Sequence, residues 1–239
     1  MNNSRIDGLV SLVITNYNRA KYLVECLDSI RQQTYSHWEI ILVDDASTDR
    51  SVEVAEQWRE QYITQQGGVN QVVVHALPRN IGFAGALNTG LYLAQGEFIA
   101  IQDSDDYSHP LRFEKQVAFL RKRPDIELVG SNYYAFSGDA PAHGKLANWI
   151  RYGEEIKKVY GRGGHCVCHG TILFRGTLFD RIGGPTRRIV GAEDYEFIAK
   201  ALNVGANIEN IPDPLYYYRQ HEGQRSTYFY GRKEKSNEQ

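Results

Sequence analysis

The sequence has no apolar run that approaches the roughly 20 residues needed for a helix to cross a bilayer. Its N-terminal segment, MNNSRIDGLVSLVITNYN, lacks the separate basic and apolar regions of a signal peptide. The short apolar stretch in this segment therefore predicts a first strand. We expect a cytoplasmic protein, and peripheral contact with the inner face of the cell membrane stays open.

Cysteine and net charge are also low. The three cysteines, Cys26, Cys166 and Cys168, form an odd count without the spacing of a disulfide framework, which fits a reducing compartment. The 27 lysines and arginines nearly balance the 29 acidic residues, and the net charge is -2. General affinity for nucleic acid or for an anionic membrane is therefore not expected.

Glycine-rich phosphate loops are missing where nucleotide-binding folds usually carry them. The first apolar run leads into ITNYN, with Thr15 and Tyr17, and neither Gly-x-Gly-x-x-Gly nor Gly-Lys-Ser/Thr follows it. This excludes the usual dinucleotide and P-loop sites at this turn. If phosphates bind there, a metal must neutralise them, and the tyrosine could stack on a base.

Strand and helix signals alternate through the first half of the chain. Apolar runs predict strands at 9–15, 39–43, 71–77, 98–102 and 127–131, and apolar residues at helical spacing predict helices at 19–33, from 49, at 85–94 and at 110–122. Asp49 is expected to cap the second helix and Gly96 to end the third. This order predicts an α/β fold with a mostly parallel sheet and helices on both faces, which binds ligands at the carboxyl ends of its strands.

The second half is less regular. We expect helices at 149–160 and 193–202, strands at 167–175 and 215–220, and a break at 161–164. No internal repeat or low-complexity linker divides the chain, so a single domain is the simplest organisation. The polar tail, 226–239, is expected to fray.

Acidic clusters follow two of the predicted strands. In QDSDDYSHP, the carboxylates of Asp103, Asp105 and Asp106 would repel one another, and a divalent cation relieves that repulsion. Mg²⁺ and Mn²⁺ prefer such oxygen ligands. The alternative is a solvated acidic loop before the next helix. In VDDASTD, Asp44 and Asp45 could accept hydrogen bonds from a ribose or a base edge, or could simply be loop residues.

Three later motifs carry further candidates. Arg79, in RNIGFAGALNTG, could face an anion beside a glycine-rich turn. Glu193 and Asp194, in GAEDYEF, could include a general base, although acids also favour helix N-termini because of the helix dipole. His221, in YYYRQHEG, could contact a metal or a diphosphate, or be an ordinary polar residue.

The segment HCVCH, at 165–169, resembles a zinc site in composition only. If it is a strand, its two cysteines and its two histidines point to opposite faces, so one ion could not gather all four. The ligand spacing of a zinc site is also missing. We therefore do not expect zinc there.

Taken together and in this order, the motifs resemble those of the family 2 glycosyltransferases of the GT-A fold. The resemblance runs from about residue 10 to about residue 225, and SLVITNYNRAKYLVECLDSIRQQTYSHWEIILVDDASTD resembles the N-terminal signature of that family. It implies a nucleotide-sugar-binding half at about 8–131, an acceptor-binding half at about 132–225 and the polar tail.

The resemblance also implies roles for single residues. Thr15, Tyr17 and Asp45 would hold the nucleoside, with Asp44 close by. Arg79 would contact the donor. Asp103 and Asp105 would form the Asp-x-Asp pair, the first towards the ribose and the second on Mn²⁺ or Mg²⁺. Asp194 would be the catalytic base, with Glu193 near the acceptor and His221 as a late metal or diphosphate contact.

The implied reaction is metal-dependent, inverting transfer of a hexose or N-acetylhexosamine. The donor would be a nucleotide-diphosphate sugar, with UDP-sugars favoured. The acceptor would be a glycan or lipid-linked glycan in bacterial surface polysaccharide synthesis. The alternatives are a non-catalytic nucleotide-sugar-binding relative and a sugar nucleotidyltransferase. The latter would need a glycine-rich loop where this chain has TNYNRAKY.

Overall fold

The computed structural model describes residues 4–66, 70–138, 144–187 and 190–225. The strands are β1 (Ile6–Asn16), β2 (Trp38–Asp44), β3 (Val72–Ala76), β4 (Gly96–Asp103), β5 (Tyr107–Ser108), β6 (Leu128–Ser137), β7 (Lys145–Leu146), β8 (Leu173–Arg175) and β9 (Ile208–Gln220). The helices are α1 (Ala20–Arg31), α2 (Ser51–Gln66), α3 (Phe83–Leu93), α4 (Arg112–Lys122), α5 (Glu154–Gly161), α6 (Gly176–Ile182), α7 (Glu193–Asn203) and a short 3-10 helix η2 (His169–Thr171). The predicted polar tail lies outside the described residues.

One mixed sheet runs through the molecule, in the order β3-β2-β1-β4-β8-β6-β9-β5, with β7 beside β6. The first four strands in this order are parallel, as the alternating pattern predicts. In the second half the sheet is mixed, because β8 runs antiparallel to both β4 and β6. The α/β fold is confirmed, and its sheet is parallel in the first half and mixed in the second.

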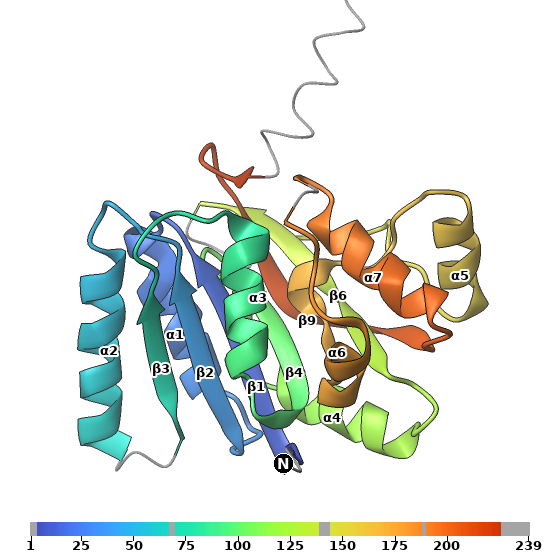
Figure 1. Ribbon diagram of the computed structural model, residues 1–239, viewed down its shortest axis with the longest axis horizontal. Helices are drawn as coiled ribbons and strands as arrows, with labels where there is room; N and C mark the ends of the chain where they lie inside the picture. The colour runs from blue at the N-terminus through green and yellow to red at the C-terminus, as the bar shows by residue number, and fades with distance from the viewer. Residues whose placement is uncertain (1–3, 67–69, 139–143, 188–189, 226–239) are drawn as a thin grey trace, which may run out of the picture.

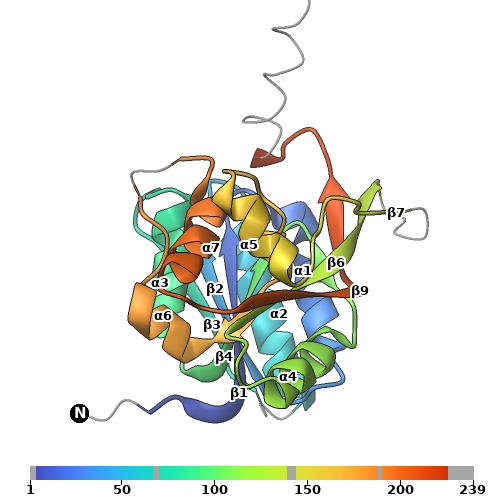
Figure 2. The same ribbon diagram turned by 90° about the vertical axis from the view of Figure 1, so that its right-hand side faces the viewer.

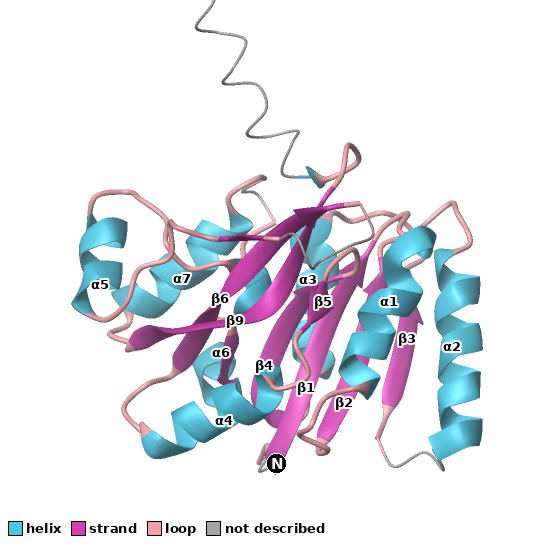
Figure 3. Cartoon of the chain, turned by 180° about the vertical axis from the view of Figure 1, so that it is seen from behind, coloured by secondary structure: helices cyan, strands magenta, loops and turns pink. Residues whose placement is uncertain are grey.

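Helices cover both faces of the sheet and close one apolar core on each. Figure 3 shows α1, α2 and α4 over one face, and Figure 1 shows α3, α5, α6 and α7 over the other. In β1, Leu12 and Ile14 belong to the first core, and Val13, between them, belongs to the second. This alternation follows from the two-residue period of a strand, and a strand buried on both faces therefore reads as a continuous apolar run.

Glycine geometry changes two of the predicted boundaries. Gly96 begins β4 and does not end α3, which stops at Leu93. A Cβ on Gly96 would lie 2.4 Å from the backbone oxygen of Leu9, so this tight strand contact requires glycine. The helix predicted from 149 begins at Glu154, because Gly153 has a φ of 56° and breaks the helical backbone before it.

The segment 167–175 is not one strand. It contains η2 and then only the three residues of β8. The strand predicted at 215–220 is instead the end of the longer β9, which packs alongside β6 (Figure 2). In the described part of the chain, no helix is long and apolar enough to span a membrane.

Candidate active site

A cleft of about 980 Å³ opens at the carboxyl ends of β1, β2 and β4. It brings together most of the residues that the sequence predicts for the site. The predicted residues that line it are Thr15, Tyr17, Asp45, Asp103, Asp105, Glu193 and Asp194. These come from the parallel half and from the start of α7, so the fold joins the predicted donor and base motifs in one cavity.

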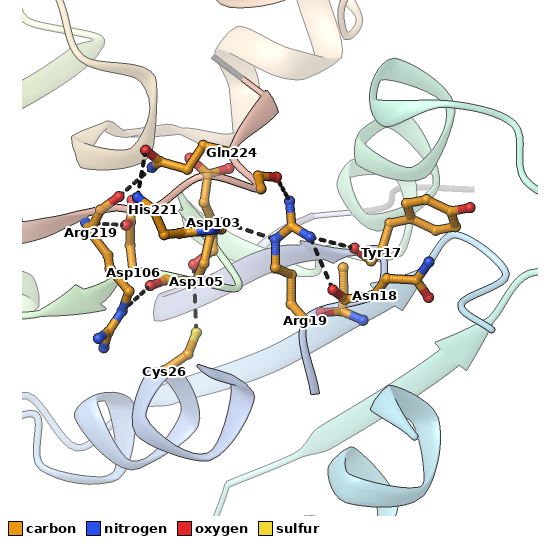
Figure 4. Close-up of polar contacts among 12 residues, drawn as sticks. Tyr17, Asn18, Arg19, Cys26, Asp103, Asp105, Asp106, Arg219, His221 and Gln224 are labelled. Carbon is orange, nitrogen blue, oxygen red and sulfur yellow. Dashed lines mark hydrogen bonds and ion pairs between the residues drawn. The ribbon is translucent and has the colours of Figure 1, made fainter. Parts of the chain in front are cut away.

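Asp105 is held by nitrogen atoms from both ends of the chain (Figure 4). Its Oδ2 lies 3.0 Å from Nε of Arg19 and 3.0 Å from Nε2 of His221. Arg19 follows β1, and His221 follows β9. His221 is not among the residues that line the cleft, so it reaches the site through Asp105.

The two acids of the Asp-x-Asp pair have opposite electrostatic settings. Burial and the neighbouring Asp105 raise the pKa of Asp103 to about 7. Burial also disfavours the charged form of Asp105, but the hydrogen bonds from His221 and Arg19 outweigh it and lower the pKa of that carboxyl. The pair therefore holds one firmly ionised carboxylate beside one that gives up its proton with difficulty.

Asp106 does not line the cleft and instead contacts the backbone of the sheet. It is 1% exposed and accepts a hydrogen bond of 2.7 Å from the backbone N–H of Arg219 in β9. Burial and the charges of Asp105 and Asp103 raise its pKa well above the ordinary value. Asp106 thus ties the acidic loop to the strand that leads to His221.

Asp44 lies beneath the loop, whereas Asp45 lines the cleft. Asp44 is fully buried, accepts hydrogen bonds from Asn16 and Ser47, and does not line the cleft. The carboxylate of Asp45 accepts the backbone N–H groups of Ile81 and Gly82, at 2.7 and 2.9 Å. It therefore caps the turn before α3, and burial raises its pKa despite these bonds.

The loop after β1 shapes the wall next to Asp45. Asn18 has a φ of 55°, and its side-chain oxygen accepts the N–H groups of Thr48 and Asp49. Tyr17 is 46% exposed and can offer its ring to a ligand. Arg79, by contrast, is exposed and outside the cleft lining, so the structure does not bring it to the other predicted site residues.

Asp194 and Glu193 open α7, where the dipole of the helix favours acids. The Oδ1 of Asp194 accepts the N–H of Tyr195 at 2.7 Å, and its Oδ2 lies 3.4 Å from Nε2 of His165. Glu193 accepts the N–H of Gly191 at 2.9 Å and forms an ion pair with Arg225. Glu193 is thus fixed in place, whereas Asp194 is about a third exposed in the cleft.

Several cleft residues are absent from the sequence-based set. They are Arg19, Phe83, Tyr133, Trp149, His165, His169 and Arg225. Arg19 lies within the ITNYNRAKY motif, so its position was a usable signal. Phe83 opens α3, and Tyr133 lies in β6. Trp149, His165 and His169 come from the irregular stretch, where no periodic pattern indicates which side chains turn inward.

The HCVCH segment is irregular before η2, so the strand argument against zinc does not hold for it. His165 stacks on Trp149 at 5.3 Å, while His169 is buried edge-on to Phe83 and Phe197. Within the described ranges, no three histidine, cysteine or acidic side chains form a ready metal site.

The chain is similar in sequence to known proteins. The model of glycosyl transferase family 2 matches residues 11–183. The chain is 32% identical over 213 residues to the putative glycosyltransferase EpsE of Bacillus subtilis, covering 88% of this chain and 73% of the relative. It is 29% identical over 216 residues to the amylovoran biosynthesis glycosyltransferase AmsE of Erwinia amylovora, covering 88% and 76%.

Solved structures share the fold. TarS 1-349 of S. aureus, in complex with UDP-GlcNAc, matches with a TM-score of 0.73 and 23% identity, over 91% of this chain and 60% of that one. The mannosyltransferase PcManGT of Pyrobaculum calidifontis, in complex with GDP-Man and Mn2+, matches with a TM-score of 0.67 and 23% identity, over 90% and 57%. The chain thus spans less than two thirds of either solved protein. Because the family model covers more than half of the sequence, the chain belongs to glycosyl transferase family 2, and its fold is GT-A.

Proposed function

We propose that this protein transfers a sugar from a nucleotide-diphosphate sugar to an acceptor hydroxyl, with inversion at the anomeric carbon. The observation that carries the proposal is the shared cleft, which Asp45, Asp103, Asp105 and Asp194 all line. A donor end and a base end within one cavity are what a direct displacement between two bound substrates needs.

The donor would lie over the carboxyl ends of the parallel strands. The ring of Tyr17 is available for a base, and Thr15 and Asp45 border the same region. We favour a UDP-sugar, a choice supported by the fold shared with TarS, which was solved with UDP-GlcNAc. GDP-sugars stay open, since PcManGT was solved with GDP-Man.

The acidic pair suits Mg²⁺ or Mn²⁺. Asp103 and Asp105 present carboxylate oxygens to one cleft, and such ions commonly bind through one or two carboxylates plus substrate phosphates. A crowded pair in which one pKa rises to about 7 also gains from a nearby cation. Asp105, Asp103 and, through Asp105, His221 would hold the ion. When bound, it supplies charge neutralisation to the diphosphate leaving group.

Asp194 would act as the general base. As the acceptor oxygen forms its bond to the anomeric carbon, its proton passes to the carboxylate of Asp194, and the bond between that carbon and the diphosphate breaks. The backbone N–H of Tyr195 fixes one oxygen of Asp194. Glu193, paired with Arg225, would shape the acceptor side without taking the proton.

The acceptor would be a glycan or a lipid-linked glycan in surface polysaccharide synthesis. This part of the proposal is supported by the similarity to the amylovoran biosynthesis protein AmsE. The cleft wall at Tyr133, Trp149 and Tyr218 is aromatic, and such rings suit the apolar face of a sugar. We also propose a cytoplasmic location, where nucleotide sugars would be available.

The test is release of nucleoside diphosphate from UDP-GlcNAc, UDP-glucose and GDP-mannose, each with and without Mn²⁺, with water in place of the acceptor hydroxyl. We expect one donor to react, and Asp194→Asn to lose about 10²- to 10⁴-fold in turnover while still binding nucleotide. Asp180→Asn is the matched control, because Asp180 pairs with Arg5 outside the cleft. Full turnover by Asp194→Asn would refute the base assignment. Nucleotide binding without turnover of any donor would favour the non-catalytic alternative.

A further inference from the structure

His165 lies beside the proposed base in the cleft. Its Nε2 is 3.4 Å from Oδ2 of Asp194, and its Nδ1 is 2.6 Å from the hydroxyl of Tyr160. The imidazole also stacks on Trp149, with 5.3 Å between ring centroids and 29° between planes. Three groups therefore fix the ring, and one of its nitrogens faces the carboxylate.

The hydrogen-bond pattern selects one tautomer of this ring. Burial raises the pKa of the Tyr160 hydroxyl, which stays protonated. Nε2 of His165 faces the carboxylate of Asp194, which can only accept a hydrogen bond, so the hydroxyl of Tyr160 donates to Nδ1. The single ring proton of a neutral imidazole consequently lies on Nε2, on the side of Asp194.

The charge state of the ring agrees with this assignment. Burial lowers the pKa of His165, although the nearby Asp194 charge opposes the shift. The ring is therefore neutral at pH 7, and it can donate one N–H without adding a positive charge beside the base. The separation of 3.4 Å is long for a hydrogen bond, but catalytic hydrogen bonds often shorten only when substrate is bound.

We propose that His165 is a positioning residue for Asp194: its Nε2–H, fixed by Tyr160, holds Oδ2 while the N–H of Tyr195 holds Oδ1. Both carboxylate oxygens are then oriented, and the remaining lone pairs point in a defined direction towards the acceptor hydroxyl. This inference rests on the proposed function, because it assigns a purpose to the base of that reaction. The two residues form a dyad that joins His165, in HCVCH, to Asp194, in GAEDYEF.

Two substitutions separate the hydrogen-bond donor of His165 from the packing of its ring on Trp149. His165→Gln keeps an N–H donor near the position of Nε2, whereas His165→Phe keeps an aromatic ring against Trp149 and removes the donor. We expect His165→Phe to lose about 10-fold or more in kcat for nucleoside diphosphate release, with the KM for the donor unchanged. We expect His165→Gln to recover most of that loss. Equal kcat for His165→Phe and the wild type, or no recovery by His165→Gln, would overturn the proposal.

A second measurement needs no substrate. In ¹⁵N-labelled nucleotide-free protein, side-chain NMR reads which ring nitrogen of His165 carries the proton, and His165→Gln assigns the signal by its loss. We expect the proton on Nε2 in the wild type and a mixture of tautomers in Tyr160→Phe. A proton on Nδ1, or on both nitrogens at pH 7.5, would refute the dyad. Full turnover by Asp194→Asn would instead refute the base while leaving the tautomer result intact.

Discussion

The guanidinium Nε of Arg19 lies 3.0 Å from Oδ2 of Asp105, although 86 residues separate them in the sequence. The same guanidinium donates a hydrogen bond of 2.6 Å to the backbone oxygen of Gly223. One side chain from the loop after β1 thus joins the acidic loop to the segment after β9. A cation that binds Oδ2 of Asp105 must share this oxygen with Arg19 and His221 or displace them.

This competition predicts the effect of removing the arginine. Arg19→Gln should bind Mn²⁺ more tightly than the wild type in the absence of nucleotide, because a positive guanidinium on Oδ2 opposes a second cation there. Titration calorimetry with MnCl₂ measures the change. Arg31→Gln is the matched control, since Arg31 pairs with Asp28 on α1 outside the cleft. Weaker Mn²⁺ binding by Arg19→Gln would contradict this view of Asp105.

The cap formed by Asp45 predicts a loss of stability. Asp45 is 4% exposed. Asp45→Ala leaves the N–H groups of Ile81 and Gly82 without the carboxylate that accepts their hydrogen bonds. We expect the free energy of unfolding to fall by about 1–3 kcal/mol, measured by urea denaturation at pH 7.5. Asp125→Ala, at an exposed ion pair, should change it by much less. If Asp45→Ala and Asp125→Ala lowered the free energy of unfolding equally, the cap would contribute no more than an exposed ion pair.

The buried ring of His169 predicts a dependence of stability on pH. Burial lowers its pKa from 6.5 to about 4. The unfolded chain therefore binds a proton more readily than the folded one in this interval. The stability that the neutral ring provides is complete above pH 6.5 and is lost as the pH falls towards 4.

Replacing this ring tests that linkage. His169→Phe should flatten the decline in unfolding free energy between pH 6.5 and 4, because phenylalanine cannot take up a proton. The exposed His75 gives the control, as His75→Gln should leave the decline unchanged. Denaturant unfolding at several pH values measures both. An unchanged slope in His169→Phe would mean that the histidine is not buried neutral in solution.

The elements that carry the proposed donor site could be predicted from the sequence. The apolar runs of β1, β2 and β4 are nearly continuous because these strands are buried on both faces. Acidic residues mark where β2 and β4 end. The acidic start of α7 could also be predicted, because helix N-termini favour carboxylates.

Other features depend on contacts that no local pattern reveals. β9 extends through Pro212 and Pro214, residues that normally argue against a strand, because its pairing with β6 shifts register in this region. Arg19 and His221 meet at Asp105 only once the sheet is assembled. The rings around His165 come from three separate places, because Tyr160 lies in α5, Tyr195 lies in α7 and Trp149 lies in irregular backbone.

The central claim is that the acidic cleft binds a nucleotide through a metal. Its most direct test is the thermal shift of the purified protein with UDP, GDP, dTDP or CDP, each with and without Mn²⁺. Asp105→Ala serves as the test variant and Asp180→Asn as its control. A ligand at 100 times its Kd should stabilise the native state by about 2.7 kcal/mol, which corresponds to a rise in Tm of roughly 5–10 °C. We predict such a rise with one nucleotide, only with Mn²⁺, in the wild type and in Asp180→Asn but not in Asp105→Ala. No rise with any nucleotide, or the same rise in Asp105→Ala, would contradict the account.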